Sequence, residues 1–357
     1  MRRSGERAGV AERLADDAAA YFESGEFERA LSSAERACEL LPQFVPALHW
    51  RAAALAEMGR MEDARVAYEQ ALAAGPEDVD LLLGTADFYV NRLQEPETHR
   101  ERLERGLELA RRARRLARRR YDPDFAAELI LLEGMALSQL GYAAEALPCL
   151  EEAIKERPDD LDALLERGFA LYELCRFDDA HAQLLEVLRK WPQESWAHHM
   201  LGLIAERQGD AKEAARRFER ARKLAPDEFP SGVELACDSF DAAVEDALLS
   251  LPEQVRNYLS NVAITVEDLP SEDDLLTSDP PLSPSILGIF RGSPLGQKAS
   301  MDPWSHLPSS IVLYQKNLER FARNRQELVE QIGITLIHEV GHFLGLDEEH
   351  LWQLGVE

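Results

Sequence analysis

Residues 195–228 read SWAHHMLGLIAERQGDAKEAARRFERARKLAPDE and hold one period of a repeat that sets the fold of most of the chain. Small residues stand five, twelve, seventeen and twenty-four positions before Pro226: Ala221, Ala214, Gly209 and Gly202. Small side chains let two paired helices cross closely, glycine permits the turn between them, and proline ends the second helix. The stretch therefore predicts a pair of antiparallel helices.

The same pattern recurs along the first 230 residues. Pro42 and Pro76 are 34 residues apart, and so are the successive prolines Pro158, Pro192 and Pro226. This period and these small residues resemble the tetratricopeptide repeat, whose helix pairs stack into a solenoid. We expect repeats near 11–44, 45–78, 127–160, 161–194 and 195–228. A sixth, with longer helices or a longer connection, is expected at 79–126, its second helix at 103–120.

A metal-binding motif lies near the end of the chain, where residues 337–357 read IHEVGHFLGLDEEHLWQLGVE. His338, Glu339 and His342 form the pattern HExxH. On a helix, residues four apart share a face, so both imidazoles can bind one metal ion. Glu339 is placed to act on water as a general base. The alternative is a surface amphipathic helix that carries two histidines by coincidence.

The third metal ligand is expected just beyond the motif. Metzincin peptidases take it from the position six residues after the second histidine, beyond a glycine turn. Gly345 can supply the turn, and Glu348 occupies that position, with Asp347 as the alternative ligand. No methionine follows Met301, so the stretch resembles a metzincin that lacks the methionine turn. The expected cofactor is Zn²⁺.

The residues between the repeats and the motif predict a small α+β unit. Strands are expected at 261–267, 285–290 and 311–314, where apolar residues cluster or alternate. Helices are expected at 238–249, 315–323 and 326–344, the last carrying the motif beneath the sheet. Residues 270–284 are acidic and rich in proline and predict a loop.

Five segments of this region resemble the bacterial minimal-zincin family of zinc metallopeptidases. In chain order they are a helix ending in LP, NVAITVEDLP, LGIFRGSPL, LPSSIVLYQKNLE and TLIHEVGHFLGLDEEHL. The resemblance covers residues 236–357 and implies a zincin-like fold, zinc on His338 and His342, and Glu339 as the base. That family commonly has Asp at the position of Glu348. We therefore expect a mostly α chain: a solenoid at 8–230 and an α+β zincin-like domain at 235–357.

Composition narrows the choice of partners. The net charge of −26 disfavours nucleic acid and anionic membranes. The run Arg111–Arg120, which holds seven arginines, is the one feature that could favour nucleic acid, because its side chains could bind phosphates. The alternative is that these arginines cover a packed helix and pair with acidic neighbours. No long apolar run predicts a membrane span. No secretory signal is recognised, and the four cysteines form no CxxC pair, so a cytoplasmic protein with reduced thiols is expected.

The sequence leaves two functions open. In the first, the protein is a zinc metallopeptidase that hydrolyses peptide bonds through zinc-activated water, and the concave groove of the repeats recruits a protein or peptide. In the second, the repeats form an interaction scaffold, and the zincin module is metal-stabilised but catalytically weak or inactive. The intact Glu339 favours the peptidase, because a purely structural metal site needs no base.

Overall fold

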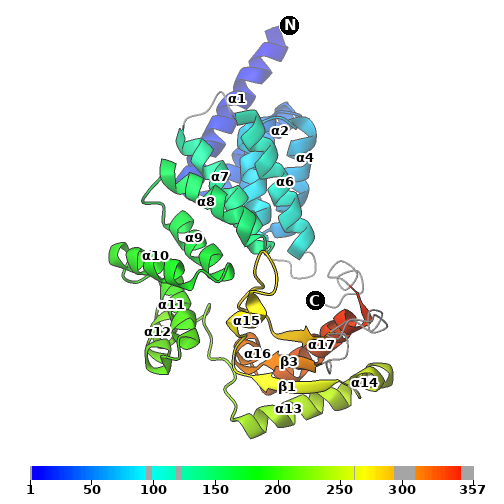
Figure 1. The fold of residues 1–357 in the computed structure, drawn as a ribbon. Coiled ribbons are helices and arrows are strands. Elements are labelled where there is room, and N and C mark those ends of the chain that lie inside the picture. The colour runs from blue at the N-terminus through cyan, green and yellow to red at the C-terminus, as the bar shows by residue number, and fades with distance from the viewer. Residues whose placement is uncertain (1, 94–98, 118–122, 261, 293–309, 347–357) are drawn as a thin grey trace. The chain divides into compact units, whose positions relative to one another are not determined.

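The structure, a computed structural model, describes residues 2–93, 99–117, 123–260, 262–292 and 310–346 (Figure 1). The chain forms two compact units, Met1–Ala170 and Leu171–Glu357. The division falls inside the helix Leu161–Glu173. Each unit is described by itself below.

Helices that pair through short turns build the repeat region, as the sequence predicts. The first unit contains α1 (Arg2–Glu23), α2 (Phe27–Leu40), α3 (Val45–Glu57), α4 (Met61–Ala74), α5 (Val79–Asp87), the π-helical turn η1 (Phe88–Arg92), α6 (His99–Ala117), α7 (Pro123–Gln139) and α8 (Ala143–Glu156). After α9 (Leu161–Glu173), the second unit continues with α10 (Phe177–Lys190), α11 (Ser195–Arg207) and α12 (Ala211–Leu224). The prediction of a mostly helical, solenoid-forming chain is confirmed.

The small residues of the repeat stand where helices cross. A Cβ added to Gly202 on α11 would come within 2.6 Å of the Phe218 ring on α12, and one added to Gly134 on α7 within 2.8 Å of Leu150 on α8. Any larger residue would push the paired helices apart. The alanines twelve positions before each proline are likewise buried: Ala30, Ala64, Ala146, Ala180 and Ala214.

The turn between paired helices requires a left-handed backbone. Gly209 has a φ of 78°, and Gly25, Gly59 and Gly141 have φ values between 74° and 80°. Cys175 lies at the same position, seventeen before Pro192, and has a φ of 56°. A side chain in this conformation is strained, because its Cβ approaches the following carbonyl oxygen.

The longer third repeat arises from a π-helical turn and an extended second helix. η1 continues α5, and the second helix, α6, begins at His99, four residues before the predicted start. Arg102 is buried and donates hydrogen bonds to the carbonyl oxygens of Tyr89 (2.7 Å) and Val90 (3.3 Å). These bonds satisfy backbone groups of the π turn, whose hydrogen-bond pattern differs from that of the α-helix.

The C-terminal part of the second unit is a small sheet with helices packed against it. Its elements are α13 (Cys237–Ser250), α14 (Glu253–Leu259), β1 (Ala263–Glu267), α15 (Glu272–Leu275), β2 (Gly288–Arg291), β3 (Ser310–Tyr314), α16 (Gln315–Phe321) and α17 (Arg325–Leu344). The strand order is β1-β3-β2. β1 runs parallel to β3, with Ile264 opposite Ile311, and β2 runs antiparallel to β3, with Ile289 opposite Val312.

The core of this region lies between the sheet and helices α13 and α17. Ile311 and Leu313 on β3 are fully buried and pack in one cluster with Phe240 of α13 and with Ile332 and Leu336 of α17. The apolar residues of α17 recur at helical spacing, so one face of the helix is held against the sheet. The same packing fixes the position of the histidine motif near its C-terminal end.

Two features of this region differ from the prediction. The structure contains helix α14, which the sequence analysis does not predict. The prediction of a loop at 270–284 is wrong for Glu272–Leu275, which form α15. Ser271 caps this helix: its hydroxyl accepts a hydrogen bond from the Asp274 backbone N–H, and the Asp274 carboxylate accepts one from the Ser271 backbone N–H. This is the reciprocal capping box, and Leu275 behind it is fully buried.

Candidate metal centre

Helix α17 has defined ends on both sides of the motif. At its start, Asn324 Oδ1 accepts hydrogen bonds from the backbone N–H groups of Gln326 (3.0 Å) and Glu327 (3.1 Å). At its end, Gly345 has a φ of 88°, and the Leu346 N–H donates to the Gly341 carbonyl at 3.0 Å. This is the left-handed C-cap expected at Gly345. The chain therefore turns back at Gly345, three residues after the second histidine.

His338 and His342 present their rings to the same point. Their Nε2 atoms lie 3.0 Å apart, and the ring planes are inclined by 80°. Two nitrogens that each bind a tetrahedral zinc ion at about 2.0–2.1 Å lie about 3.3 Å apart. The observed separation is that of an N–H···N hydrogen bond between the rings and is also close to the zinc value, so a small widening would fit the two imidazoles to a shared metal ion.

A backbone carbonyl orients one of these rings. The Nδ1 atom of His342 lies 3.2 Å from the Leu346 carbonyl oxygen, which the turn at Gly345 brings back to the helix. If Nδ1 carries the proton and donates this bond, Nε2 keeps its lone pair for a metal. Metal-binding histidines commonly have such an outer hydrogen bond. The C-cap thus supplies a hydrogen-bond partner for the His342 ring as well as ending the helix.

Glu339 lies between α17 and strand β2. It is about 100° around the helix axis from His338, and only 5% of its surface is exposed. Gly288 faces it on β2: a Cβ built there would lie 3.6 Å from Glu339 Cγ and 2.7 Å from Thr335 Cγ2. A glycine is thus required for β2 to pass this close to α17. Within the LGIF segment, the sequence pattern alone does not single out Gly288.

The candidates for the third ligand, Asp347 and Glu348, lie outside the described residues. Among the residues that the structure describes, no group of three or more His, Cys, Asp or Glu side chains could hold a metal ion. The third ligand therefore stays a prediction, based on the position of Glu348 beyond the turn.

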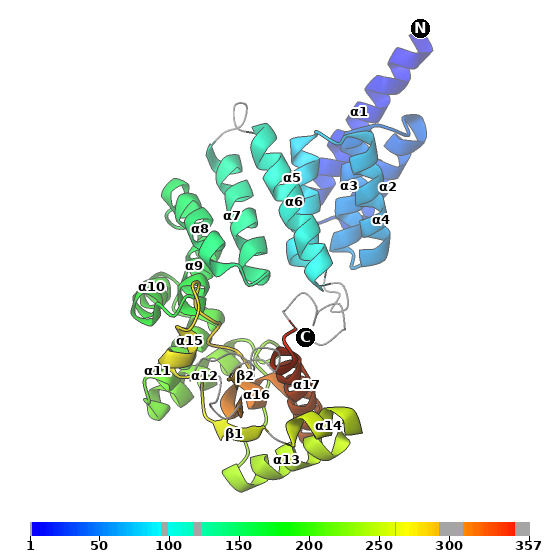
Figure 2. The same cartoon turned by 45° about the vertical axis from the view of Figure 1, so that its right-hand side comes forward.

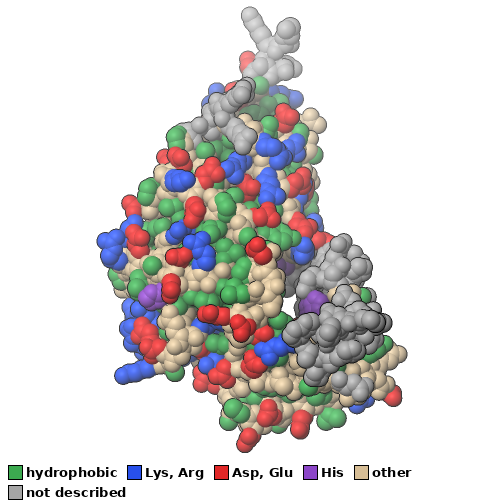
Figure 3. Space-filling model, viewed as in Figure 1, with side chains coloured by type: hydrophobic (Ala, Val, Ile, Leu, Met, Phe, Trp, Pro, Cys, Tyr) green, Lys and Arg blue, Asp and Glu red, His purple; other side chains and the backbone are tan. Residues whose placement is uncertain are grey.

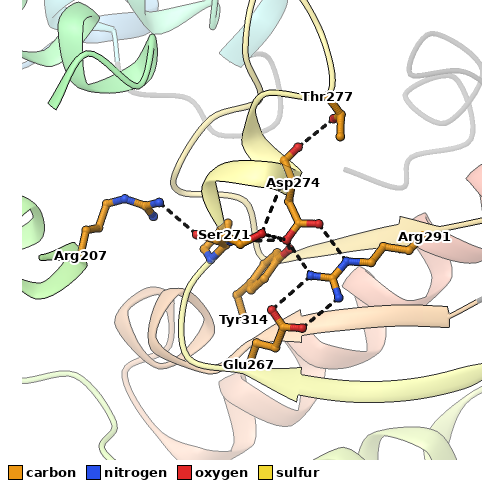
Figure 4. A network of polar contacts seen from close by, with 8 residues as sticks. Arg207, Glu267, Ser271, Asp274, Thr277, Arg291 and Tyr314 are labelled. Atoms are coloured by element: carbon orange, nitrogen blue, oxygen red, sulfur yellow. Dashed lines mark hydrogen bonds and ion pairs between the residues drawn. The ribbon is translucent and has the colours of Figure 1, made fainter. Parts of the chain in front are cut away.

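A polar network holds the three strands and α15 together (Figure 4). Arg291 at the end of β2 binds the Asp274 carboxylate through Nε (2.8 Å) and Nη2 (2.6 Å). The same guanidinium binds Glu267 on β1 at 2.9 Å, and the Tyr314 hydroxyl on β3 donates to Asp274 at 3.1 Å. Burial alone would raise the pKa of Asp274, but bonds from Arg291 and Ser271 outweigh it and lower the pKa to about 2. Sequence reasoning missed this network, although the pattern Ser271-x-x-Asp274 is a signal for a capped helix.

Two arginines of the run on α6 pair with acidic neighbours inside the first unit. Arg111 Nε lies 2.9 Å from Glu133, and Arg114 bridges Glu133 (2.9 Å) and Glu152 (2.6 Å). Arg118–Arg120 lie outside the described residues. On the face drawn in Figure 3, basic and acidic side chains are interspersed. For Arg111 and Arg114, these pairs agree with the alternative in which the arginines cover a packed helix and pair with acidic neighbours.

No helix in the described part of the chain has both the length and the apolar character needed to cross a bilayer.

Comparison with protein-family models supports both parts of the chain. Residues 259–356 match a family described as zincin-like metallopeptidase. Residues 16–79, 137–204 and 195–228 match tetratricopeptide-repeat models. The match at 195–228 has the same bounds as the repeat that the sequence predicts there.

Known proteins are similar to the repeat region. A TPR repeat-containing protein of Pseudomonas aeruginosa is 30% identical over 118 residues, which is 32% of this chain and 20% of the relative, so the chain spans only a fifth of that relative. The solved PilF of Pseudomonas aeruginosa has a TM-score of 0.50 at 17% identity, over 66% of this chain and 99% of its own.

PilW, described as a widely conserved type IV pilus biogenesis factor, has a TM-score of 0.52 at 18% identity, over 61% of this chain and 94% of its own. Both structural likenesses show the helical-repeat fold alone. Together with the family matches, they establish that the chain carries N-terminal tetratricopeptide repeats and a C-terminal zincin-like metallopeptidase domain.

Proposed function

We propose that the C-terminal domain is a zinc-dependent peptidase and that the repeats bring a protein substrate or partner to it. The observation that carries this proposal is the 3.0 Å approach of the His338 and His342 Nε2 atoms on a helix that also carries Glu339, which can serve as a base. The match of residues 259–356 to zincin-like metallopeptidases supports the same chemistry.

His338 and His342 would hold the zinc ion, with Glu348, or alternatively Asp347, as the third ligand. Bound zinc lowers the pKa of a coordinated water toward about 7 and polarises a substrate carbonyl. The donor set of two imidazoles and one carboxylate is typical of catalytic rather than structural zinc sites. With the proton on His342 Nδ1, its hydrogen bond to the Leu346 carbonyl would keep Nε2 free to bind the metal.

Glu339 would move the proton. Its carboxylate would take a proton from the attacking water and return it to the nitrogen of the departing amine, so that a single residue would serve as base and then as acid. Its position beside β2, with 5% of its surface exposed, keeps bulk water away from this proton. The Gly288 backbone leaves room for the carboxylate there.

Strand β2 is placed to hold the substrate. It is an edge strand of the described sheet, pairing with β3 on one side, and it passes beside Glu339. An extended peptide can add to such an edge through main-chain hydrogen bonds. That arrangement would bring a peptide bond next to the base without requiring a particular side chain at each position.

The test combines metal content with cleavage. Purified wild type should contain about one zinc per chain, and His342→Ala should lose it. Glu339→Gln should keep zinc but cleave a proteome-derived peptide library about 10²–10⁴-fold more slowly than wild type. Mass spectrometry of the library measures the cleavage. The absence of zinc from wild type prepared without chelators would refute the metal site. Equal cleavage by wild type and Glu339→Gln would refute the peptidase mechanism and favour the scaffold.

A further inference from the structure

The first unit contains a groove that is formed by the first helices of successive repeats. Its volume is about 490 Å³, and its lining residues come from α1, α3, α5 and α7 and the turn before α5. In Figure 2 these helices succeed one another along the repeat region. Because the second helices of the pairs contribute no lining residue, the groove lies on the face that the first helices share.

The charged groups of this groove are all acidic. Asp78, Asp80, Asp87 and Glu128 line it, and the described lining includes no lysine or arginine. Asp80 and Glu128 have exposed side chains without a hydrogen-bond or ion-pair partner in the described part of the chain. Burial, and then the nearby Asp78, raises the pKa of Asp80. Asp87 lies 3.7 Å from Arg92, whereas Asp80 and Glu128 leave negative charge in the groove without an ion-pair partner in the described part of the chain.

Aromatic rings and an unpaired imidazole complete the wall. The His49 ring stacks on Trp50 with centroids 5.2 Å apart, and Trp50 contacts the Phe22 ring at the same distance. Burial lowers the pKa of His49 to about 4, so the ring is neutral at physiological pH. Neither of its nitrogens has a hydrogen-bond partner among the described residues. A neutral imidazole offers one acceptor nitrogen, and an aromatic face attracts cations.

Further acidic residues lie beyond this groove in the first unit. Asp162 and Glu166 lie on α9, the first helix of a later repeat. Burial, and then Asp162, raises the pKa of Glu166 to about 7, although the nearby Ser138 opposes the shift. Burial likewise raises the pKa of Glu128; the nearby Arg157 charge opposes this shift, and the charges of Asp87 and Asp160 add to it. Acidic groups thus follow one another over several repeats, which suits a chain-like ligand better than a single small cation.

We propose that this groove binds a protein segment rich in lysine or arginine. Lysine and arginine side chains are donors only and carry the positive charge that the carboxylates lack. Their cationic groups can also lie against Trp50 and Phe22. This inference rests on the recruiting role in the proposed function and deepens it by giving the chemistry of the recruited segment.

The test measures binding to the full chain carrying Glu339→Gln, so that no probe is cleaved. The probe is a fluorescein-labelled peptide in which lysine alternates with alanine and serine. Two further peptides have glutamine or glutamate in place of every lysine. The lysine peptide should bind most tightly, and its fluorescence anisotropy should show weaker binding as salt rises.

Charge-neutralising variants locate the site. Asp80→Asn combined with Glu128→Gln should raise the Kd of the lysine peptide roughly fivefold or more. The matched control, Glu35→Gln with Glu39→Gln on α2, removes the same charge outside the groove and should change the Kd less than about twofold. Circular dichroism melts should be alike for both variants, because the substituted side chains are exposed.

Three results would overturn the inference: no binding of the lysine peptide, equal binding of the glutamine peptide, or equal effects of the groove and control variants. None of them depends on zinc or cleavage. The peptidase proposal and this inference can therefore fail separately.

Discussion

Replacing Asp274 by asparagine should loosen the small sheet of the C-terminal domain. The Asp274 carboxylate is mostly buried, its side chain 10% exposed, and it accepts hydrogen bonds from Arg291, Ser271 and Tyr314. The asparagine amide would place a donor against the Arg291 or Ser271 donors. It would also leave Glu267 as the remaining carboxylate bound to the Arg291 guanidinium.

The magnitude follows from the pKa. These contacts lower the pKa of Asp274 from its ordinary value of 3.8 to about 2. A difference of nearly two pKa units corresponds to about 2 kcal/mol of stabilisation at neutral pH. Since the folded-state pKa is the lower one, this stabilisation is present above about pH 4 and is lost as the pH falls toward about 2.

Hydrogen exchange followed by mass spectrometry measures the loss of stability in the sheet of the C-terminal domain itself. Loss of about 2 kcal/mol should speed exchange of the β3 amides about 30-fold at neutral pH, while amides of the repeats keep their rates. The matched control is Asp273→Asn, which removes the same charge from an exposed neighbouring residue. Equal β3 exchange in the two variants would show that the network of Figure 4 does not hold the sheet together.

Three other variants test separate parts of the structure. Cys175→Gly should raise the free energy of unfolding of its repeat, measured by local hydrogen exchange, by about 1 kcal/mol, because glycine adopts a φ of 56° without strain. The reverse change, Gly209→Cys, should lower the free energy of unfolding by a similar amount, and an unchanged value would contradict the argument. Glu348→Ala should weaken zinc binding more than Asp347→Ala in competition with a chelator, and the opposite order would shift the ligand by one residue. Gly288→Val should lower the stability of the C-terminal domain by about 1–3 kcal/mol, since even its Cβ would approach Thr335 to 2.7 Å; an unchanged melting temperature would mean that β2 does not pass so close to α17.

The sequence predicts the repeats well because their structure is encoded locally. A turn with positive φ requires glycine, and a close helix crossing requires a small residue, each at a fixed position of the repeat. A period of 34 residues in these positions therefore predicts the helix pairs. Helix α17 shows the same principle: predicted at 326–344, it spans Arg325–Leu344 and ends at the glycine expected to end it. Even Cys175 is understandable from its place in the period, because it stands where other repeats have glycine.

Long-range arrangement is what the sequence did not reveal. Apolar clusters located three strands approximately, but nothing in them indicates that β3, the last of the described strands, occupies the centre of the described sheet. Asp274 looks like one more acidic residue in a proline-rich stretch until Arg291, seventeen residues later, is seen to bind it. The closeness of Gly288 to Glu339 depends on the same sheet order. The proposed roles of His338, Glu339, His342 and the third ligand remain for metal analysis to test.

The central position of β3 also bears on how the chain acquires its structure during synthesis. Each repeat packs mainly against its sequence neighbours, so repeats can fold soon after they leave the ribosome. In the part of the chain that the structure describes, β1 and β2 pair only with β3, which begins at Ser310. The sheet therefore cannot close until that strand has emerged, and the histidine helix α17 begins at Arg325, after α16. In this order α17, with its two histidines, joins the fold only after the repeats have emerged and packed.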